Sequence, residues 1–184
     1  MNFETTNLPG VILIDPDVHR DDRGFFLESY NERRYVEAGV HAHFVQANHS
    51  YSTQGTLRGL HAQIQHPQAK LVRVIEGSAY DVAVDIRKGS PTFGRYFGAE
   101  LSHENFQQLF IPAGFAHGFC VTSKICQFEY SCSDFYHAGD EIIIAWNDPQ
   151  IGIPWPVPDP RLSDRDAGAS NLDQLLEQLP IYTE

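Results

Sequence analysis

The sequence predicts a mainly β protein built as a sandwich or barrel, on two observations. Short runs rich in Val, Ile, Phe and Tyr recur from Gly10 onward, separated by Gly, Pro, Asn and Asp. In residues 80–86, apolar residues alternate with Asp81, Ala83 and Asp85. This period of two places one face of a strand in the core and the aspartates on the other face. About ten such runs are typical of a closed antiparallel sheet.

The other strands follow from the same apolar runs and from the turns between them. Residues 70–75 precede the alternating strand, and the intervening Glu76-Gly77-Ser78 predicts a β-hairpin. Pro112 and Gly114 predict a turn that places His117 at the start of a strand. The remaining strands are expected at residues 11–14, 24–28, 43–48, 95–101, 107–111, 125–130 and 141–146.

Two stretches favour helix at the periphery of the sheets. Ser29 and Glu32 have the spacing of a capping box, and Gly39 would end the helix that follows. Leucines in residues 172–179 repeat at helical spacing. The proline-rich residues 149–160 predict an extended surface segment.

Length and charge limit the classes of protein that this chain can represent. With 184 residues, of which 42% are hydrophobic, it can bury one sizeable core, so we expect a single domain over residues 1–184. Lys and Arg total 13 against 24 Asp and Glu, which gives a net charge of -11. Such a surface repels polyanions, so no nucleic-acid partner is expected. A few basic side chains in one pocket can still bind a small anion.

The cysteines and the apolar runs indicate a cytoplasmic protein. Cys120, Cys126 and Cys132 are odd in number and lack the CxxC spacing of metal sites, so we expect reduced thiols. No segment resembles a secretory signal, and the longest apolar runs are only strand-sized. No membrane is expected as a partner.

Two segments carry most of the candidate chemistry. One is Arg58-Gly-Leu-His61-Ala-Gln63, and the other is residues 112–119 around His117. Residues 112–119 resemble the second motif of cupin barrels, and the Arg58 segment occupies the place of the first cupin motif. Metal-binding cupins carry a His-x-His pair and a nearby Glu there, because a divalent ion needs three or four convergent ligands. Here Gln63 occupies the paired position and no Glu occurs before Glu76, so no metal is expected.

The two motif histidines, together with Arg58 and Lys70, favour a functional pocket over a purely structural polar network. Buried charges and imidazoles are costly unless they are paired or used. His41 and His43 also have paired spacing, but without a companion carboxylate they are expected at the surface. An iron or nickel site at that pair is the alternative.

Longer blocks of the sequence are similar to one family of metal-free cupin enzymes. They are Asp22-Arg-Gly-Phe-Phe-x-Glu-Ser, Phe44-Val-Gln-x-Asn-His-Ser, Arg58-Gly-Leu-His-x-Gln, Lys70-Leu-Val-Arg, Tyr80-Asp-Val-Ala-Val-Asp-Ile-Arg, Ser90-Pro-Thr-Phe-Gly, Ile111-Pro-x-Gly-Phe-Ala-His-Gly-Phe, Trp146-Asn-Asp and Leu162-Ser-x-x-Asp. Together they resemble the dTDP-4-dehydrorhamnose 3,5-epimerase family over residues 9–167. The resemblance implies a cupin-type double-stranded β-helix, or jelly-roll barrel, with a few peripheral helices and no cofactor.

The resemblance also implies the reaction and its catalytic residues. The substrate is a 4-keto-6-deoxyhexose on thymidine diphosphate, inverted at C3 and C5 through an enolate whose charge lies on the C4 oxygen. His61 matches the base, and Asp166 matches the carboxylate that orients it. Tyr130 matches the phenol that returns a proton from the opposite face. Lys70 and His117 match the donors to the C4 oxygen.

Further residues match the substrate-binding positions of the family. Arg58 and Arg23 match the guanidinium groups that clamp the diphosphate. The other matched positions are Phe26, Glu28, Gln46, Asn48, Asp81, Tyr136 and Glu141, of which Asp81 is equally well explained as a structural acceptor beside the histidines. The family is homodimeric, which implies that residues 1–50 contribute to the dimer interface. Arg23, Phe26 and Glu28 would then complete the pocket of the partner, and residues 149–184 would wrap the barrel.

The sequence differs from the family at one position, and several other functions remain possible on the sequence alone. Ala62 stands where the family usually has an aromatic residue, which predicts an altered pocket wall and allows a single-site 3- or 5-epimerase. A 3,4-ketoisomerase also uses a histidine base on this barrel. More remote alternatives are a metal-dependent cupin enzyme and a nucleotide-sugar-binding protein without catalysis. The resemblance most directly implies the supply of dTDP-rhamnose for surface polysaccharide.

Overall fold

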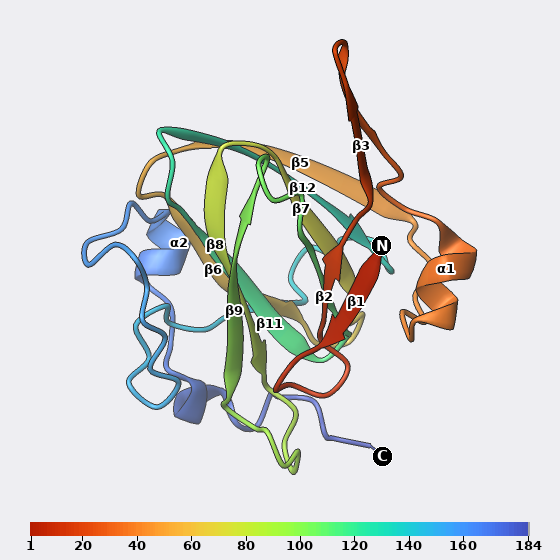
Figure 1. Ribbon diagram of the computed structural model, residues 1–184. Coiled ribbons are helices and arrows are strands. Elements are labelled where there is room, and N and C mark those ends of the chain that lie inside the picture. The colour runs from red at the N-terminus through yellow and green to blue at the C-terminus, as the bar shows by residue number, and fades with distance from the viewer. Residues whose placement is uncertain (184) are drawn as a thin grey trace.

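The computed structural model describes residues 1–183, which form a barrel of two facing antiparallel sheets (Figure 1). In these residues, the six-stranded sheet has the order β1 (Asn2–Thr5), β2 (Ile12–Asp15), β10 (Gln108–Ile111), β7 (Lys70–Glu76), β12 (Ile125–Cys132) and β5 (Gln46–Thr53). The five-stranded sheet has the order β13 (Glu141–Ile143), β6 (Leu57–Gln63), β11 (Phe115–Val121), β8 (Ser78–Asp85) and β9 (Tyr96–Ser102). The chain passes repeatedly between the sheets, as in a jelly roll, so the predicted fold class is confirmed.

The predicted hairpin at Glu76-Gly77-Ser78 is wrong. β7 pairs with β10 and β12, whereas β8 pairs with β11 and β9, so the two consecutive strands lie in opposite sheets. Gly77, with φ 82°, is where the chain crosses from one sheet to the other. A turn sequence shows that the chain changes direction, but pairing partners far along the chain decide which sheet it joins.

Gly77 gives a testable prediction about stability. A Cβ at this position would overlap the carbonyl oxygen of Ile125, whereas a Cβ at Gly89, which has nearly the same φ, would meet no atom within 4 Å. We expect Gly89→Ala to cost about 1–2 kcal/mol for the left-handed backbone alone. Gly77→Ala should cost roughly 1–3 kcal/mol more for the backbone overlap. Urea unfolding of both variants measures the difference, and equal losses would contradict the crossing geometry.

Strand β8 is buried on both faces. Val82 and Val84 face outward and pack under the C-terminal segment, in a cluster with Ile151 and Leu172. Asp81 is on the opposite face, as predicted, but that face belongs to the barrel interior, so the carboxylate is fully buried. The alternation therefore predicted the direction of the side chains correctly but not their burial, because the second face of β8 packs inside the barrel instead of facing solvent.

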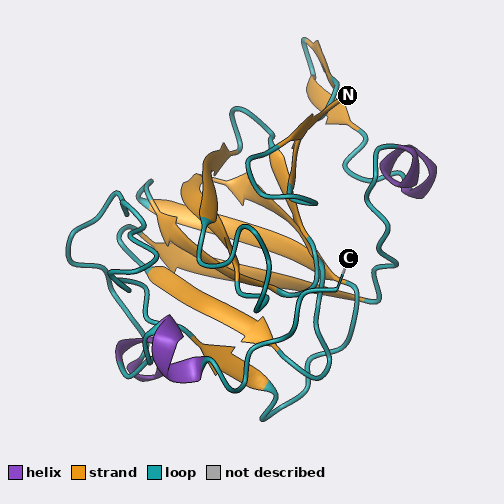
Figure 2. Ribbon diagram, turned by 90° about the horizontal axis from the view of Figure 1, so that it is seen from below, coloured by secondary structure: helices purple, strands orange, loops and turns teal. Residues whose placement is uncertain are grey.

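The helices lie at the edges of the molecule (Figure 2). Helix α1 spans Glu32–Glu37 and ends before Gly39, as expected, but its N-cap is Asn31, whose side chain accepts from the Arg34 amide. Ser29 instead offers its carbonyl oxygen to the buried Tyr35 hydroxyl. The expected helix over residues 172–179 is only a 3-10 turn, η1, at Leu172–Leu175, and α2 (Asp164–Ala167) was not expected from the sequence.

A two-stranded hairpin extends from the barrel at the top of Figure 1. It consists of β3 (Val18–Asp21) and β4 (Gly24–Leu27), of which only the second was expected. Phe26 on β4 is 72% exposed. Among residues 1–183, no helix is long and apolar enough to cross a bilayer.

Candidate active site

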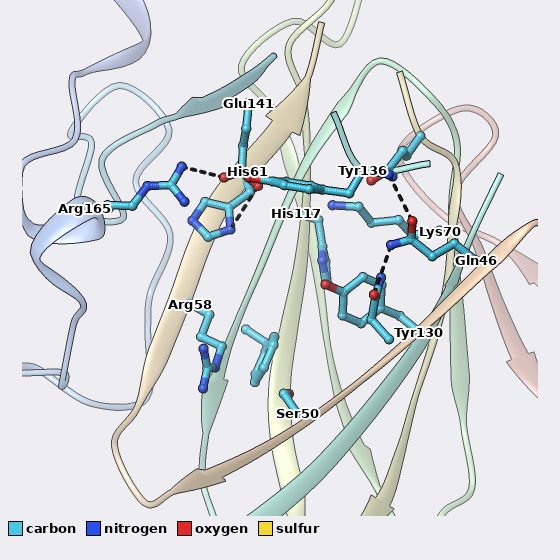
Figure 3. A pocket seen from close by; sticks show the side chains of 13 residues that line it. Gln46, Ser50, Arg58, His61, Lys70, His117, Tyr130, Tyr136, Glu141 and Arg165 are labelled. Carbon is cyan, nitrogen blue, oxygen red and sulfur yellow. Dashed lines mark hydrogen bonds and ion pairs between the residues drawn. The ribbon is translucent and has the colours of Figure 1, made fainter. Parts of the chain in front are cut away.

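A cavity of about 480 Å³ opens between the two sheets (Figure 3). Both sheets and the C-terminal segment contribute side chains to its wall. The lining residues are Gln46, Asn48, Ser50, Arg58, His61, Gln68, Lys70, His117, Phe119, Tyr130, Tyr136, Glu141 and Arg165. The cavity therefore gathers most of the predicted site residues, which come from segments far apart in the sequence.

His61 on β6 and Asp166 on α2 form a tight pair beside this cavity. His61 Nε2 lies 2.6 Å from Asp166 Oδ1, and Asp166 Oδ2 accepts from the Ser163 hydroxyl at 2.7 Å. Ser163 is also the N-cap of α2 and accepts from the Asp166 amide, so the short helix fixes the carboxylate. Burial raises the pKa of Asp166, but the hydrogen bonds from His61 and Ser163 outweigh it and hold this pKa below its usual value.

An ionised Asp166 determines the tautomer of His61. The carboxylate can only accept, so neutral His61 donates from Nε2 and keeps its lone pair on Nδ1. Nδ1 lies 3.9 Å from Glu141 Oε1, and the other Glu141 oxygen accepts from Arg165 at 2.6 Å. Figure 3 shows this His61 ring between Arg165 and the cavity. The free lone pair is therefore on the nitrogen that faces away from Asp166, which is the position that a general base requires.

His117 on β11 forms a second histidine–carboxylate pair, and this one is buried. Its Nε2 lies 2.7 Å from Asp81 Oδ1 on the neighbouring strand β8, and Asp81 is fully buried. Burial lowers the pKa of His117, and Asp81 opposes that shift only in part. A neutral ring that donates Nε2–H to Asp81 has a lone pair at Nδ1, so it accepts there. The predicted role of His117 as a hydrogen-bond donor to the C4 oxygen of the substrate would require the protonated imidazolium.

Lys70 and Tyr130 form the opposite wall, on β7 and β12 of the six-stranded sheet. The Lys70 Nζ lies 6.0 Å from the Tyr130 ring centroid, and the Tyr130 and His117 rings are 6.3 Å apart. Among residues 1–183, the Lys70 ammonium has no hydrogen bond or ion pair, so its protons are available to a ligand. Burial lowers the pKa of Lys70. Burial also raises the pKa of Tyr130 to about 12, which keeps the phenol protonated at neutral pH.

Polar groups at the cavity mouth come mainly from β5. Gln46 donates to Asn48 Oδ1 at 3.0 Å and accepts from the Tyr136 amide at 3.0 Å, which ties the loop after β12 to this strand. The Arg58 guanidinium donates to the Ser52 hydroxyl at 3.1 Å, and within residues 1–183 its remaining N–H groups have no partner, which leaves them for an anion.

Four predicted substrate-binding residues do not line the cavity of this chain. One is Asp81, which is bonded to His117, and the other three lie near the N-terminus. The side chain of Arg23 is 85% exposed at the turn of the projecting hairpin, where it pairs with Asp21. Phe26 is on the same hairpin. Glu28 follows the hairpin, and its carboxylate accepts a hydrogen bond from the Asn31 side chain at 3.0 Å. None of the three lines the cavity. Their predicted contact with the pocket of a partner stays a prediction.

Two sequence departures have structural explanations. Gln63, which stands where a metal-binding cupin has histidine, uses its amide to bind loop backbone, donating to the His66 and Phe135 carbonyls and accepting from the His137 amide. Ala62 faces the core on the outer side of the five-stranded sheet, with Ile142 and Ile144. The expectation that Ala62 alters the pocket wall is wrong, because its strand neighbours His61 and Gln63 occupy the inner face.

Arg165 is the main cavity residue that sequence reasoning missed. It directly precedes Asp166, and its pairing with Glu141 depends on the way α2 packs against β13. The one sign of Arg165 in the sequence was its position inside the Leu162-Ser-x-x-Asp block. Ser50 and Phe119 end two of the blocks quoted above, but no role was assigned to them. Gln68 lies in a loop outside the blocks.

Comparison with known proteins identifies the family. The family profile described as dTDP-4-dehydrorhamnose 3,5-epimerase matches residues 5–174. The dTDP-4-dehydrorhamnose 3,5-epimerase of Pseudomonas aeruginosa is 55% identical over 86% of this chain and 89% of the relative. That of Methanothermobacter thermautotrophicus is 49% identical over 98% of this chain and 97% of the relative.

A solved structure agrees with these sequence matches. The crystal structure of dTDP-6-deoxy-D-glucose-3,5-epimerase from Legionella pneumophila, in complex with dTDP-4-keto-L-rhamnose, has a TM-score of 0.96 and 47% identity. The match covers 100% of this chain and 99% of that chain. The resemblance noted in the sequence is thus confirmed, and the chain belongs to the dTDP-4-dehydrorhamnose 3,5-epimerase family and is an isomerase.

Proposed function

We propose that this protein converts dTDP-4-dehydro-6-deoxy-D-glucose into dTDP-4-dehydro-L-rhamnose, for dTDP-rhamnose biosynthesis in the cytoplasm. The observation that carries the proposal is the placement of a carboxylate-held histidine on one sheet and a protonated tyrosine on the other, with the cavity between them. Inversion of a carbon centre requires proton removal from one face and proton return to the other. The Legionella relative holds dTDP-4-keto-L-rhamnose, which agrees with this substrate class.

The proposed chemistry assigns one step to each group. His61 Nδ1 removes the proton from C3 or C5, both of which are acidified by the C4 ketone, and Asp166 stabilises the resulting imidazolium. The electron pair of the broken C–H bond moves into an enolate whose charge lies on the C4 oxygen. Lys70 donates to that oxygen in a site screened from water. Tyr130 then gives its proton to the carbon from the opposite face. The His61 imidazolium releases its proton to solvent and the Tyr130 phenolate takes a proton from solvent, after which the same steps invert the second centre.

Product stereochemistry tests the proposed function directly. The purified protein is incubated with dTDP-4-dehydro-6-deoxy-D-glucose, the ketone is reduced with borohydride, and the released sugars are identified. Inversion at both carbons gives rhamnose and 6-deoxytalose, whereas inversion at C3 alone gives 6-deoxyallose and 6-deoxygulose. Recovery of only 6-deoxyglucose and fucose, the reduction products of unchanged substrate, would contradict the proposal.

Deprotonation of Lys70 should set the alkaline limit of activity. The charged ammonium is the useful form and exists below its folded pKa, which burial places below the usual 10.5. Turnover should therefore fall as pH rises through that lowered pKa, while Tyr130, with a pKa of about 12, stays protonated. In Lys70→Arg the alkaline fall should move to higher pH, because a guanidinium keeps its charge. Lys70→Ala should weaken both turnover and keto-sugar binding. An unchanged alkaline limb in Lys70→Arg, measured by initial rates, would remove Lys70 from this role.

The projecting hairpin predicts a site shared between two copies in a homodimer. If Arg23 completes the pocket of its partner, Arg23→Ala and His61→Asn homodimers are each inactive, but a mixed dimer has one intact site. Mixing, with subunit exchange, should restore about a quarter of wild-type turnover, since half of the dimers are mixed. Mixing His61→Asn with Asp166→Asn provides the matched control. If the site is instead built from one chain, the Arg23→Ala mixture will show no gain.

A further inference from the structure

Two loops beside the cavity are held together by a set of hydrogen bonds. Residues 64–69 connect β6 to β7, and residues 133–140 connect β12 to β13. Gln63 bridges them, because it donates to the His66 carbonyl at 2.8 Å and accepts from the His137 amide at 2.7 Å. Gln63 is nearly fully buried. The two backbones are thus held at a fixed separation.

Further contacts fix the same loops from the other side. Asp140 accepts from the amides of Gln65 and His66, both at 2.8 Å. Gln68 donates to the Asp134 carbonyl at 2.8 Å. These bonds order the backbone before any ligand arrives, which reduces the entropy lost on binding.

The loops bring together two imidazoles and a carboxylate. The His66 and His137 rings stack with centroids 3.7 Å apart and planes 12° apart. Asp134 Oδ2 lies 3.9 Å from His66 Nδ1, and one ligand atom from each of the three residues lies within 4.8 Å of the others. Within residues 1–183, no ring nitrogen of either histidine has a hydrogen bond. Among the same residues, the Asp134 carboxylate accepts a hydrogen bond only at Oδ1, from the Phe135 amide. The remaining lone pairs are therefore uncommitted.

We propose that His66, Asp134 and His137 bind a divalent transition-metal ion of the zinc type. Two imidazole nitrogens and one carboxylate oxygen match the ligands that Zn²⁺ takes, with the fourth position left for water. Both rings are at least partly exposed and rotate about the Cβ–Cγ bond to aim a lone pair at the ion. The net charge of -11 adds a general attraction for cations.

This site is separate from the position that a metal takes inside a cupin barrel. That position would involve His61 and His117, and the residue that replaces its other histidine, Gln63, here braces the two loops. The bound ion would tie the loops at the rim of the cavity, where Gln68 and Tyr136 line the wall. The Tyr136 amide already donates to Gln46, so the ion would stiffen one side of the mouth.

Calorimetric titration of the full chain with Zn²⁺, after removal of metals with EDTA, tests the proposal. We expect one ion per chain, with binding weakened roughly tenfold or more in His66→Gln and in His137→Gln, since each removes one of three ligands. The matched control is His41→Gln/His43→Gln, which removes the exposed His-x-His pair and should leave binding unchanged. Co²⁺ absorption gives an independent readout of nitrogen ligation. Amide exchange across residues 133–140 should slow with Zn²⁺ in the wild type but not in His66→Gln.

Three outcomes would overturn the proposal. They are no binding at millimolar Zn²⁺, undiminished binding in either loop variant that folds, and loss of binding in the His41/His43 variant alone. Circular dichroism verifies the fold of each variant. Because the two loop variants are independent, either one that folds decides the result.

Discussion

We expect His61→Asn to lower turnover by about 10²–10⁴-fold while dTDP binds as in the wild type, because the variant loses only the general base. Asp166→Asn should lower turnover on the same scale. An amide can donate to His61 Nε2 and so drive the imidazole proton to Nδ1, which removes the lone pair facing away from Asp166. Steady-state kinetics and calorimetric titration with dTDP measure the two effects separately.

Matched controls exist for both variants. Asp164 is in the first turn of the same short helix but is exposed and touches neither His61 nor the cavity, so Asp164→Asn should retain full turnover. His43→Asn removes an exposed imidazole outside the cavity and should also have no effect. Near-normal turnover in either His61→Asn or Asp166→Asn would show that the base lies elsewhere.

Tyr130→Phe should separate proton removal from proton return. Without the hydroxyl, His61 still forms the enolate and returns a solvent deuteron from its own side, so exchange continues in D₂O. Formation of the inverted product should fall by about 10²–10⁴-fold, the usual contribution of one positioned proton donor. NMR of one reaction mixture follows both quantities. Tyr51→Phe, at an exposed position of β5, is the control.

The opposite result would be informative as well. If Tyr130→Phe stops exchange and inversion together, Tyr130 acts before or during enolate formation. It would then belong with Lys70 as a donor to the C4 oxygen, and the acid on the far face would have to be another group. Retention of full inversion would exclude Tyr130 from the reaction.

The strands could be predicted because their signal is local, but their partners could not. Alternation along residues 80–86 is visible in the sequence, yet nothing local showed that β7 and β8 join opposite sheets. Ser29 and Asn31 both suit a helix N-terminus. In the structure the Ser29 carbonyl accepts from Tyr35 and from Gln108 on a distant strand, and Asn31 caps the helix. The leucine spacing in residues 172–179 predicted a longer helix than the structure has. Packing against the barrel limits this segment to one 3-10 turn.

The proposed catalytic residues could be predicted because they lie in recognisable sequence blocks. The residues around them could not be predicted in this way. His61, Lys70 and His117 each belong to a motif. Arg165 reaches the cavity only because α2 packs against the end of β6 and β13, and a sequence has no local sign of that contact. His66 and His137 are about seventy residues apart in the chain, and only the folded loops bring them into contact.

Proton exchange at C3 and C5 of dTDP-4-dehydro-6-deoxy-D-glucose in D₂O is the measurement that tests the central claim most directly. NMR follows the loss of both proton signals while the wild-type protein turns over. The account predicts deuterium at both carbons of the product, because His61 removes each proton and Tyr130 returns one that has exchanged with solvent. Inverted product that keeps its original protons at C3 and C5 would contradict it, since no deprotonation would then have taken place.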